Sequence, residues 1–480
     1  MPEVGEVSDS VRARFETGIR VGGLARGYFG EYAEVPYSDD KGFMIEATER
    51  LISSGARVIA EASFSCDGNF CSVDILRLNE DGGFDIVEVK SVSGSEDEDD
   101  GKPVKLVHLH DMAYQYYVVT KCGHRVDSVS LMPLNRNYVR QGDLDVRRLF
   151  VVRDCTDEVV SMQNDIEDNI AEIKRIAEAR DEPDIDIGSY CNDPYACTYA
   201  GWCWRHVPED SVFDIRNRMF HADKYDLYRE GIVTMRQLLE AGVGVTDRQM
   251  LQVRTACEDL PPTIDKDAIR EFLDGLTYPL YHLDFETWQQ AIPEFDGVRP
   301  YMQIPTQYSL HIQERPGAEP EHREFLGKEG EDPRRAIAER LCTDIPPDAC
   351  VLAYHMSFEK GRIKELAAEF PDLADHLMGI HDNMRDLAVP FRQTAYYCRE
   401  MQGSYSLKAV LPALFPDDPE LDYHALDLIH DGAEAMNAFA TLHEQPHEDI
   451  PRIRQALLAY CRVDTLAMVR ILGRLYEVSA

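Results

Sequence analysis

Residues 278–287 read Tyr-Pro-Leu-Tyr-His-Leu-Asp-Phe-Glu-Thr, an apolar run that ends in two acids. The run predicts a β-strand, and strand alternation places residues i and i+2 on the same face of a sheet. Asp284 and Glu286 therefore share one face. Two carboxylates side by side are costly in a core, whereas their oxygens are good ligands for a divalent cation. This stretch predicts a metal site on a strand of an α/β fold.

A helical pattern near the end of the chain supplies a partner for the two strand acids. Tyr460 and Asp464 lie four residues apart, so they share one face of the expected helix. Asp464 alone would be interpreted as a solvated helix acid. Together with Asp284 and Glu286, however, it indicates a two-metal centre for phosphodiester chemistry.

A further acid is needed to hold two cations in line with a phosphate, and the best candidate is Glu359. It follows the apolar run 351–354 and opens a helix expected over 360–370. We expect Tyr460 to position the attacking water or to act as its general base. Asp386 is interpreted as a capping or packing acid. The expected ligands of Mg²⁺ or Mn²⁺ are Asp284, Glu286, Glu359 and Asp464.

A short polar segment, residues 403–408, precedes an apolar helix in the same half of the chain. It reads Gly-Ser-Tyr-Ser-Leu-Lys. Hydroxyl and ammonium groups are donors that proteins use to bind phosphate oxygens. We therefore expect contacts with a nucleic-acid backbone from Ser404, Tyr405 and Lys408.

A second acidic pattern lies near the N-terminus. Asp74 falls in an expected strand, and Glu88 and Lys90 end the next strand on one shared face. Asp74 and Glu88 could hold a divalent ion, while Lys90 positions a water and steadies negative charge. Taken alone, Glu88 and Lys90 would be interpreted as a strand-end salt bridge. With Asp74 before them and Gln115 after them, in the helix expected over 106–121, they indicate a second nuclease site.

Three cysteines within thirteen residues, Cys191, Cys197 and Cys203, predict a loop wrapped on a metal. With one further Cys they would hold a 4Fe–4S cluster, and with His206 they could hold zinc. The alternative is three buried thiols packed near tryptophans. Spacing does not identify the fourth ligand, and the remaining candidates are Cys66, Cys71 and Cys155.

The charge of the chain is extreme, with 87 acidic against 50 basic residues and a formal net charge of −37. Such acidity would normally argue against a nucleic-acid partner, because binding relies on neutralising phosphates. Molar salt weakens this objection by screening long-range repulsion. We interpret the acidity as an adaptation to a salt-rich, halophilic cytoplasm; the alternative is an acidic interaction surface.

No run approaches the roughly eighteen apolar residues of a membrane span, and residues 1–20 lack an apolar signal core. We therefore expect a cytoplasmic protein with no membrane partner. In that compartment the 12 cysteines are expected to be thiols or metal ligands rather than disulfides.

Composition and the positions of turn-forming and loop-forming residues predict four segments. Strands and helices alternate in the first, a Cys-rich stretch follows, short helices form a bridge, and the last segment opens with strands and ends in helices. The expected boundaries are 1–180, 181–215, 216–265 and 266–480.

These motifs together resemble a known family, the domain of unknown function 2779. In the C-terminal half the resemblance rests on residues 283–287, 304–311, 358–362 and the Tyr460-x-x-x-Asp464 pair. That domain is similar to DnaQ-like (DEDDy) 3′→5′ exonucleases of the ribonuclease H-like fold. Glu359 stands where DnaQ relatives carry Asp.

The N-terminal half is similar to RecB-family PD-(D/E)XK nucleases, including the iron–sulfur nuclease of CRISPR adaptation. The matching stretches are residues 86–91, 131–140 and the three-Cys segment, although Val119 stands where a RecB-type motif carries Tyr. The resemblance implies a restriction-endonuclease-like domain followed by a ribonuclease H-like mixed sheet flanked by helices.

The resemblance and the acidic motifs lead to one functional expectation. The chain is expected to be a metal-dependent nuclease, a 3′→5′ exonuclease on single-stranded ends, with DNA favoured over RNA. The alternatives are a catalytically impaired nucleic-acid-binding scaffold and a small-molecule phosphodiesterase.

Overall fold

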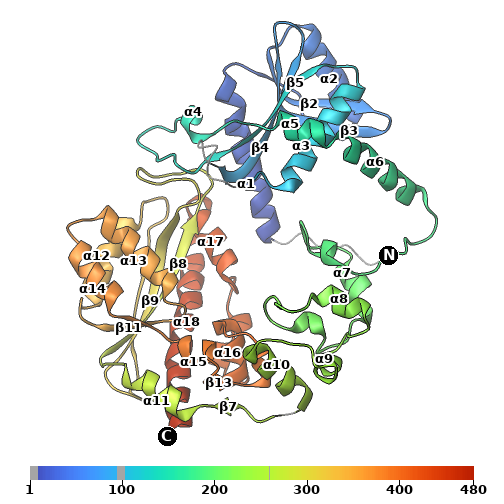
Figure 1. Ribbon diagram of the computed structural model, residues 1–480. Coiled ribbons are helices and arrows are strands. Elements are labelled where there is room, and N and C mark those ends of the chain that lie inside the picture. The colour runs from blue at the N-terminus through green and yellow to red at the C-terminus, as the bar shows by residue number, and fades with distance from the viewer. Residues whose placement is uncertain (1–8, 95–102, 259) are drawn as a thin grey trace. The chain divides into compact units, whose positions relative to one another are not determined.

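The computed structural model describes residues 9–94, 103–258 and 260–480, and the chain divides into two compact units (Figure 1). The N-terminal unit comprises the described residues up to Ile185 together with Gln289–Met302. The C-terminal unit comprises Asp186–Trp288 and Gln303–Ala480. Each unit combines a mixed sheet with helices, which confirms the α/β class predicted from the sequence.

A six-stranded sheet in the order β1-β2-β3-β4-β5-β6 forms the centre of the N-terminal unit. Strands β2, β3 and β4 form an antiparallel meander, whereas β5 runs parallel to β4. The parallel step requires a crossover, which α3 (Leu106–Lys121) provides. The strands are β1 (Ala33–Glu34), β2 (Val58–Cys66), β3 (Asn69–Leu78), β4 (Phe84–Gly94), β5 (Val126–Asn135) and β6 (Arg153–Asp154).

Both faces of this sheet are covered. On β4, Ile86 packs into a core with Met44 and Met112, whereas the next residue, Val87, packs on the opposite face with Val21. The polar stretch after β6 forms two helices that meet at Met162. The helices of this unit, besides α3 and the four-residue α4 (Val146–Leu149), are α1 (Asp9–Ala25), α2 (Lys41–Ser53), α5 (Thr156–Ser161) and α6 (Gln163–Glu178).

A five-stranded sheet in the order β10-β9-β8-β11-β12 forms the centre of the C-terminal unit. Strands β8, β11 and β12 are parallel, and β10 is antiparallel to β9. The apolar run predicted as a strand is β8. The strands are β8 (Leu280–Gln289), β9 (Gln303–Gln313), β10 (Glu321–Leu326), β11 (Cys350–Ala353) and β12 (Met384–Asp386).

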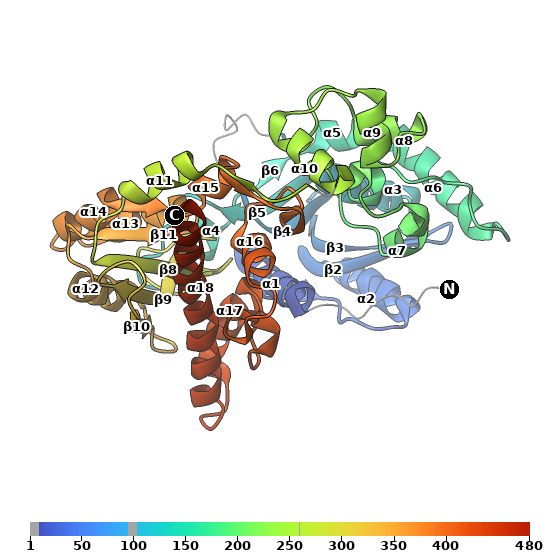
Figure 2. The same ribbon diagram turned by 90° about the horizontal axis from the view of Figure 1, so that it is seen from below.

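Helices cover both faces of this sheet as well (Figures 1 and 2). Leu283 and Phe285 of β8 point to the face that α12, α13 and α14 cover, and Leu280 points to the face that α18 covers. Although α18 has 30 residues, no helix in the described part of the chain is both long and apolar enough to cross a membrane. These helices are α12 (Arg334–Asp344), α13 (Ser357–Glu369), α14 (Ala374–Asp382) and α18 (Ile450–Ser479).

The middle of β9 alternates between an apolar and a polar face. Tyr308, Leu310 and Ile312 enter the core beneath α12–α14. The residues between them bind α18: Gln307 Nε2 donates to the Leu457 carbonyl at 2.8 Å, and Ser309 and His311 lie 2.6 Å and 2.8 Å from the Thr465 hydroxyl. Because these groups are buried, the bonds fix how α18 lies across the sheet.

Three short helices form a separate small core between the Cys-rich stretch and β8. Leu227, Leu238 and Val253, one from each helix, meet there with Val212 and Met219. The sequence predicted this helical segment. The helices are α8 (Lys224–Arg229), α9 (Met235–Ala241) and α10 (Asp247–Glu258).

We predict that Thr465→Val lowers the free energy of unfolding by about 1–3 kcal/mol, because it removes the partner of the buried His311 Nδ1 and one of the two partners of the Ser309 hydroxyl. Chemical denaturation measures the change. The matched control is Thr343→Val, an exposed helical threonine whose hydroxyl bonds only a carbonyl of its own helix. Equal stability of the two variants would contradict the role assigned to Thr465.

Candidate active site

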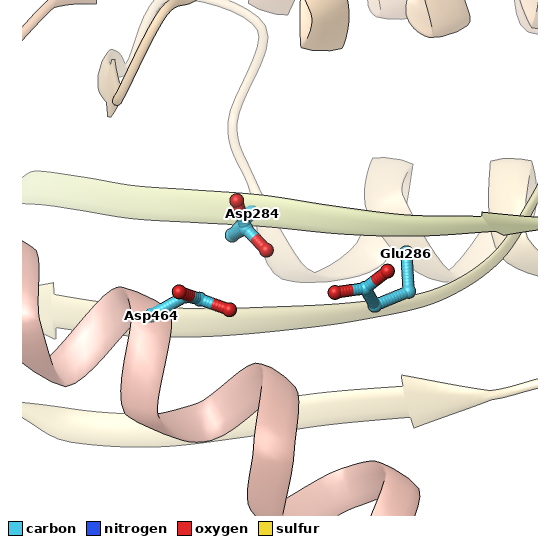
Figure 3. Close-up of side chains that lie close together, drawn as sticks. All are labelled: Asp284, Glu286 and Asp464. Atoms are coloured by element: carbon cyan, nitrogen blue, oxygen red, sulfur yellow. The ribbon is translucent and has the colours of Figure 1, made fainter. Parts of the chain in front are cut away.

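Three carboxylates meet where β8 passes under α18. Asp284, Glu286 and Asp464, here called the acidic trio, each place one oxygen within 4.8 Å of the other two. Figure 3 shows their side chains turned toward one another, two from the strand and one from the helix. Alternation explains the strand pair, because Leu283 and Phe285 occupy the opposite face. The structure thus brings together three of the four predicted ligands.

Glu359, the fourth predicted ligand, lies in the first turn of α13 and is buried. Glu359 does not belong to the acidic trio, whose oxygens lie within 4.8 Å of one another. Its charge nevertheless raises the pKa of Asp284. Its Oε2 is buried and has no hydrogen-bond partner in the described structure. A buried carboxylate oxygen without a donor is a position that a cation would satisfy.

Burial dominates the electrostatics of these acids. It raises the pKa of Glu286 and of Glu359 to about 8 and the pKa of Asp464 to about 6, with repulsion from neighbouring carboxylates adding to it at both glutamates. The pKa of Asp284 rises well above its usual value for the same two reasons. Four acids in so little space cannot all ionise without a compensating charge. The all-oxygen donor set suits Mg²⁺ or Mn²⁺.

Tyr460 lies one helical turn before Asp464 and is buried against the same acids. Burial, followed by the charges of Asp464 and Glu286, raises the pKa of its hydroxyl. The hydroxyl therefore stays protonated and acts as a donor. A Cβ atom added at Gly432 would lie 3.9 Å from both the Tyr460 hydroxyl oxygen and Glu286 Oε2. Both groups therefore lie beside the start of α17 (Gly432–Ala440).

Tyr423 is a site residue that the sequence analysis missed. Its hydroxyl donates to Asp464 Oδ1 at 2.5 Å, and its ring centroid lies 5.7 Å from that of Tyr460. It lies in a short 3₁₀ turn between helices, where no periodicity marks it. Cys461 was also missed; its Sγ lies 3.7 Å from Asp284 Oδ2.

A cavity of about 620 Å³ lies beside the acidic trio. Tyr423, which binds Asp464, is in its wall, and so is Asp431, the residue before Gly432. Lys408 lines the same cavity, and its ammonium lowers the pKa of Glu286 against the larger effect of burial. None of the three acids lines the cavity, and Tyr423 stands between it and Asp464.

The other two residues predicted to bind a nucleic-acid backbone lie away from this cavity. The Tyr405 ring is 5.4 Å from the His355 ring, and the Arg248 guanidinium lies 4.3 Å above it. The Ser404 hydroxyl oxygen is 3.2 Å from that of Ser406. The three residues predicted to bind a nucleic-acid backbone therefore do not lie together: Lys408 lines the cavity, whereas Ser404 and Tyr405 lie outside it.

Asp386 accepts hydrogen bonds as a packing acid would. It binds the backbone N–H groups of His355 and Ala388 at 3.0 Å each, and the Arg392 guanidinium at 2.8 Å. The bond to the His355 N–H ties the loop before α13 to β12 and so supports the position of Glu359.

In the N-terminal unit, Glu88, Lys90 and Gln115 meet beside the middle of β4, because this strand continues to Gly94 and does not end at Lys90 as the sequence predicted. Lys90 Nζ donates to Glu88 Oε1 at 2.5 Å and to Asp111 Oδ2 at 2.6 Å. Gln115 Nε2 donates to Glu88 Oε2 at 2.7 Å. The salt bridge considered from the sequence is therefore present, and it includes Asp111. That residue was missed, although it lies one helical turn before Gln115 on α3.

Asp74 lies on the neighbouring strand β3 and accepts a hydrogen bond from the Val89 N–H at 2.7 Å. Burial raises the pKa of Asp74 to about 6 and that of Glu88 to about 8, and the Asp74 charge adds to the shift at Glu88. Within the described residues, these acids and Asp111 do not form a ligand group as close as the acidic trio.

Cys191, Cys197 and Cys203 do not bring their sulfurs together as a ligand group in the part of the chain described. Cys191 is buried and Cys197 exposed, and the Cys197 N–H donates to the Cys191 carbonyl at 2.8 Å. His206 Nε2 lies 2.8 Å from the Tyr228 hydroxyl oxygen. An iron–sulfur cluster or zinc in this segment stays a prediction.

Comparison with known proteins gives one match. The model of a protein family, Domain of unknown function (DUF2779), matches residues 281–406, which confirms the resemblance inferred for this segment. The matched segment includes Asp284, Glu286 and Glu359 but ends before Tyr460 and Asp464. No curated protein and no solved structure matches the chain.

We predict that Mn²⁺ raises the melting temperature more at about pH 9 than at about pH 6. The pKa values of Glu286 and Glu359 are raised from 4.5 to about 8 in the metal-free folded state, so stability falls as pH rises from about 4.5 and the loss is complete above about 8. Cation binding requires the ionised form and releases protons. Thermal scans with and without Mn²⁺ measure the effect.

In the same scans Asp464→Asn should reduce the Mn²⁺ shift, whereas Asp375→Asn, an exposed acid of α14, should retain it. A shift that is independent of pH and equal in the two variants would contradict a cation site at the trio.

Proposed function

We propose that this chain, which carries a DUF2779 segment at residues 281–406, is a metal-dependent nuclease that acts as a 3′→5′ exonuclease on single-stranded ends. DNA is favoured over RNA as the substrate. The observation that carries the proposal is the acidic trio with Glu359 and Tyr460 beside it, five buried or nearly buried groups from one strand and two helices. Such a set suits metal-dependent phosphodiester hydrolysis.

The sheet of the C-terminal unit supports this proposal. Counted in chain order from β8, its strands lie in the order 3-2-1-4-5, which is the order of ribonuclease H-like sheets. Two of the acids project from the first strand, which lies in the middle of the sheet. The mixed sheet of the N-terminal unit, with Asp74, Glu88 and Lys90 on adjacent strands, likewise supports a PD-(D/E)XK fold.

The acids would hold one or two divalent cations: Asp284 and Asp464 face each other, and Glu286 and Glu359 flank them. When bound, such cations polarise the phosphate and activate a water. The chain's own groups do the positioning. Because the Tyr460 hydroxyl stays protonated, it donates a hydrogen bond that orients the water or a phosphate oxygen. Tyr423 holds the Asp464 carboxylate through its 2.5 Å bond.

The cavity beside the trio is large enough for the terminal nucleotide of a strand, although four aspartates are among the residues that line it. The Phe415 and Tyr423 side chains line it, and aromatic rings of this kind stack on bases. Lys408 lines it as well and offers a charge for a phosphate. A nucleotide held there would place its phosphodiester next to the acids.

One observation favours a second function for the N-terminal unit. Lys90 is bound by two carboxylates, Glu88 and Asp111, and is not free to act on a water. A nuclease fold held in this state would bind nucleic acid without cleaving it. Lys90→Ala should then leave cleavage by the full chain unchanged.

The exonuclease proposal is tested with single strands labelled at the 3′ or the 5′ end, incubated with Mn²⁺ in high KCl. We predict immediate release of a labelled mononucleotide from the 3′-labelled strand and gradual shortening of the 5′-labelled strand. Asp284→Ala should lower the rate by roughly a hundredfold or more, because it removes a metal ligand.

The control is Asp375→Ala, which removes an exposed acid from α14 and should cleave like the wild type. If Asp284→Ala and the wild type degraded the strands equally, the proposal would be wrong.

A further inference from the structure

Three arginines line a small pocket on the helical segment of the C-terminal unit. Arg216, Arg218 and Arg248 border a volume of about 80 Å³, and no acidic side chain lines it. In a chain of net charge −37, a recess lined by three cations and no anion is an unusual place. The volume is several times that of one water molecule, so a phosphate group fits and a whole nucleotide does not.

Two of the three guanidinium groups are exposed, and the third is partly buried with unused donors. Among the described residues, Arg216 and Arg218 have no ion-pair partner, and both side chains are exposed. Arg248 donates through Nη1 to the Arg392 carbonyl at 2.8 Å. Its Nε and Nη2 are shielded from solvent and have no hydrogen-bond partner in the described structure. Buried N–H groups without an acceptor are rare, and a small movement of the Arg248 side chain would present them to a phosphate oxygen.

Two buried glutamines hold the pocket in shape. Gln249 Nε2 donates to the carbonyls of Arg216 and Arg218 at 3.0 Å and 3.3 Å. Gln252 Oε1 accepts from the Arg216 N–H at 3.0 Å. Gly403 closes one wall so tightly that a Cβ there would lie 2.4 Å from Gln252 Oε1. The backbone that carries the arginines is therefore fixed before any ligand binds, which lowers the entropic cost of binding.

An exposed aromatic ring completes the pocket. Phe220 lines it and exposes 78 % of its surface. Arginines that bind phosphate beside a ring that stacks on a base form the combination used by proteins that bind single-stranded nucleic acid. A free phosphate ion would use the arginines but gain nothing from Phe220.

The pocket is joined to the acidic site by direct contacts. Arg248 stacks on the Tyr405 ring, and Tyr405 contacts the His355 ring. The Tyr354 hydroxyl donates to the Tyr405 carbonyl at 2.8 Å. His355 precedes α13, whose first turn carries Glu359. A strand that leaves the acids along these side chains would reach the pocket.

We propose that Arg216, Arg218 and Arg248 bind a backbone phosphate of the single-stranded substrate, upstream of the nucleotide at the acids, while Phe220 stacks on the adjoining base. This inference rests on the proposed nuclease function and adds a second contact point for the strand. Of the three arginines, the partly buried Arg248 should be screened least by high salt, because salt screens partly buried charges less than exposed ones.

The test measures binding of fluorescein-labelled oligo-dT to the full chain, in an Asp284→Ala background that prevents degradation. Strands of about four and about sixteen nucleotides are compared over a range of KCl concentrations. Arg216→Gln/Arg218→Gln should weaken binding of the long strand about tenfold and reduce the gain in affinity from short to long strands. Each lost phosphate contact should lower the salt slope by about 0.7.

Phe220→Ala should weaken binding of the long strand by about tenfold without changing the salt slope, because stacking involves no counterion release. The controls are Arg315→Gln and Phe15→Ala, an exposed arginine and an exposed phenylalanine outside the pocket. Both should bind the long strand like the background protein.

The inference is overturned if the double arginine variant keeps the affinity and salt slope of Arg315→Gln while the wild type still shows Asp284-dependent exonuclease activity. It is also overturned if inorganic phosphate competes at the pocket while Phe220→Ala binds the strand normally, since the pocket would then be a free-anion site. Absence of both strand binding and Mn²⁺-dependent degradation would instead overturn the proposed function itself.

Discussion

The docking of α18 onto the polar face of β9 is the interaction on which the candidate site depends. Gln307, Ser309 and His311 point away from the apolar core because strand alternation turns every second residue of β9 toward the helix. Their bonds to Leu457 and Thr465 fix how α18 is rotated about its axis and how far along its axis it is placed relative to β9. A rotation of the helix by one residue, about 100°, would carry Asp464 away from Asp284 and Glu286.

Once α18 is in place, charge becomes the main constraint. The site buries carboxylates whose pKa values are raised by burial and by one another, and Lys408 opposes this effect at Glu286. An apolar core could not tolerate these groups ionised. The arrangement is reasonable if a divalent cation binds there, and the unpaired Glu359 Oε2 points to the same conclusion. At such a site some folding stability is given up for cation binding.

Local patterns predicted much of this molecule. The strand around Asp284 and the shared helical face of Tyr460 and Asp464 could be predicted from the sequence, because each lies in a regular element with a fixed period. The contact of Tyr423 with Asp464 could not be predicted, since it depends on the path of an irregular segment. The arginine pocket was missed for the same reason: its residues come from a turn after Val212–Asp214, from α10 and from the segment at Gly403, and no periodicity links them.

The central claim is that the acidic trio is a divalent-cation site, and anomalous scattering from crystals soaked in Mn²⁺ tests it most directly. The account predicts a manganese peak bound by carboxylate oxygens of Asp284 and Asp464, at about 2.1–2.2 Å, with Glu286 or Glu359 also coordinating. A trio that stays free of manganese above pH 8, with its carboxyls protonated and hydrogen-bonded to one another, would contradict the account.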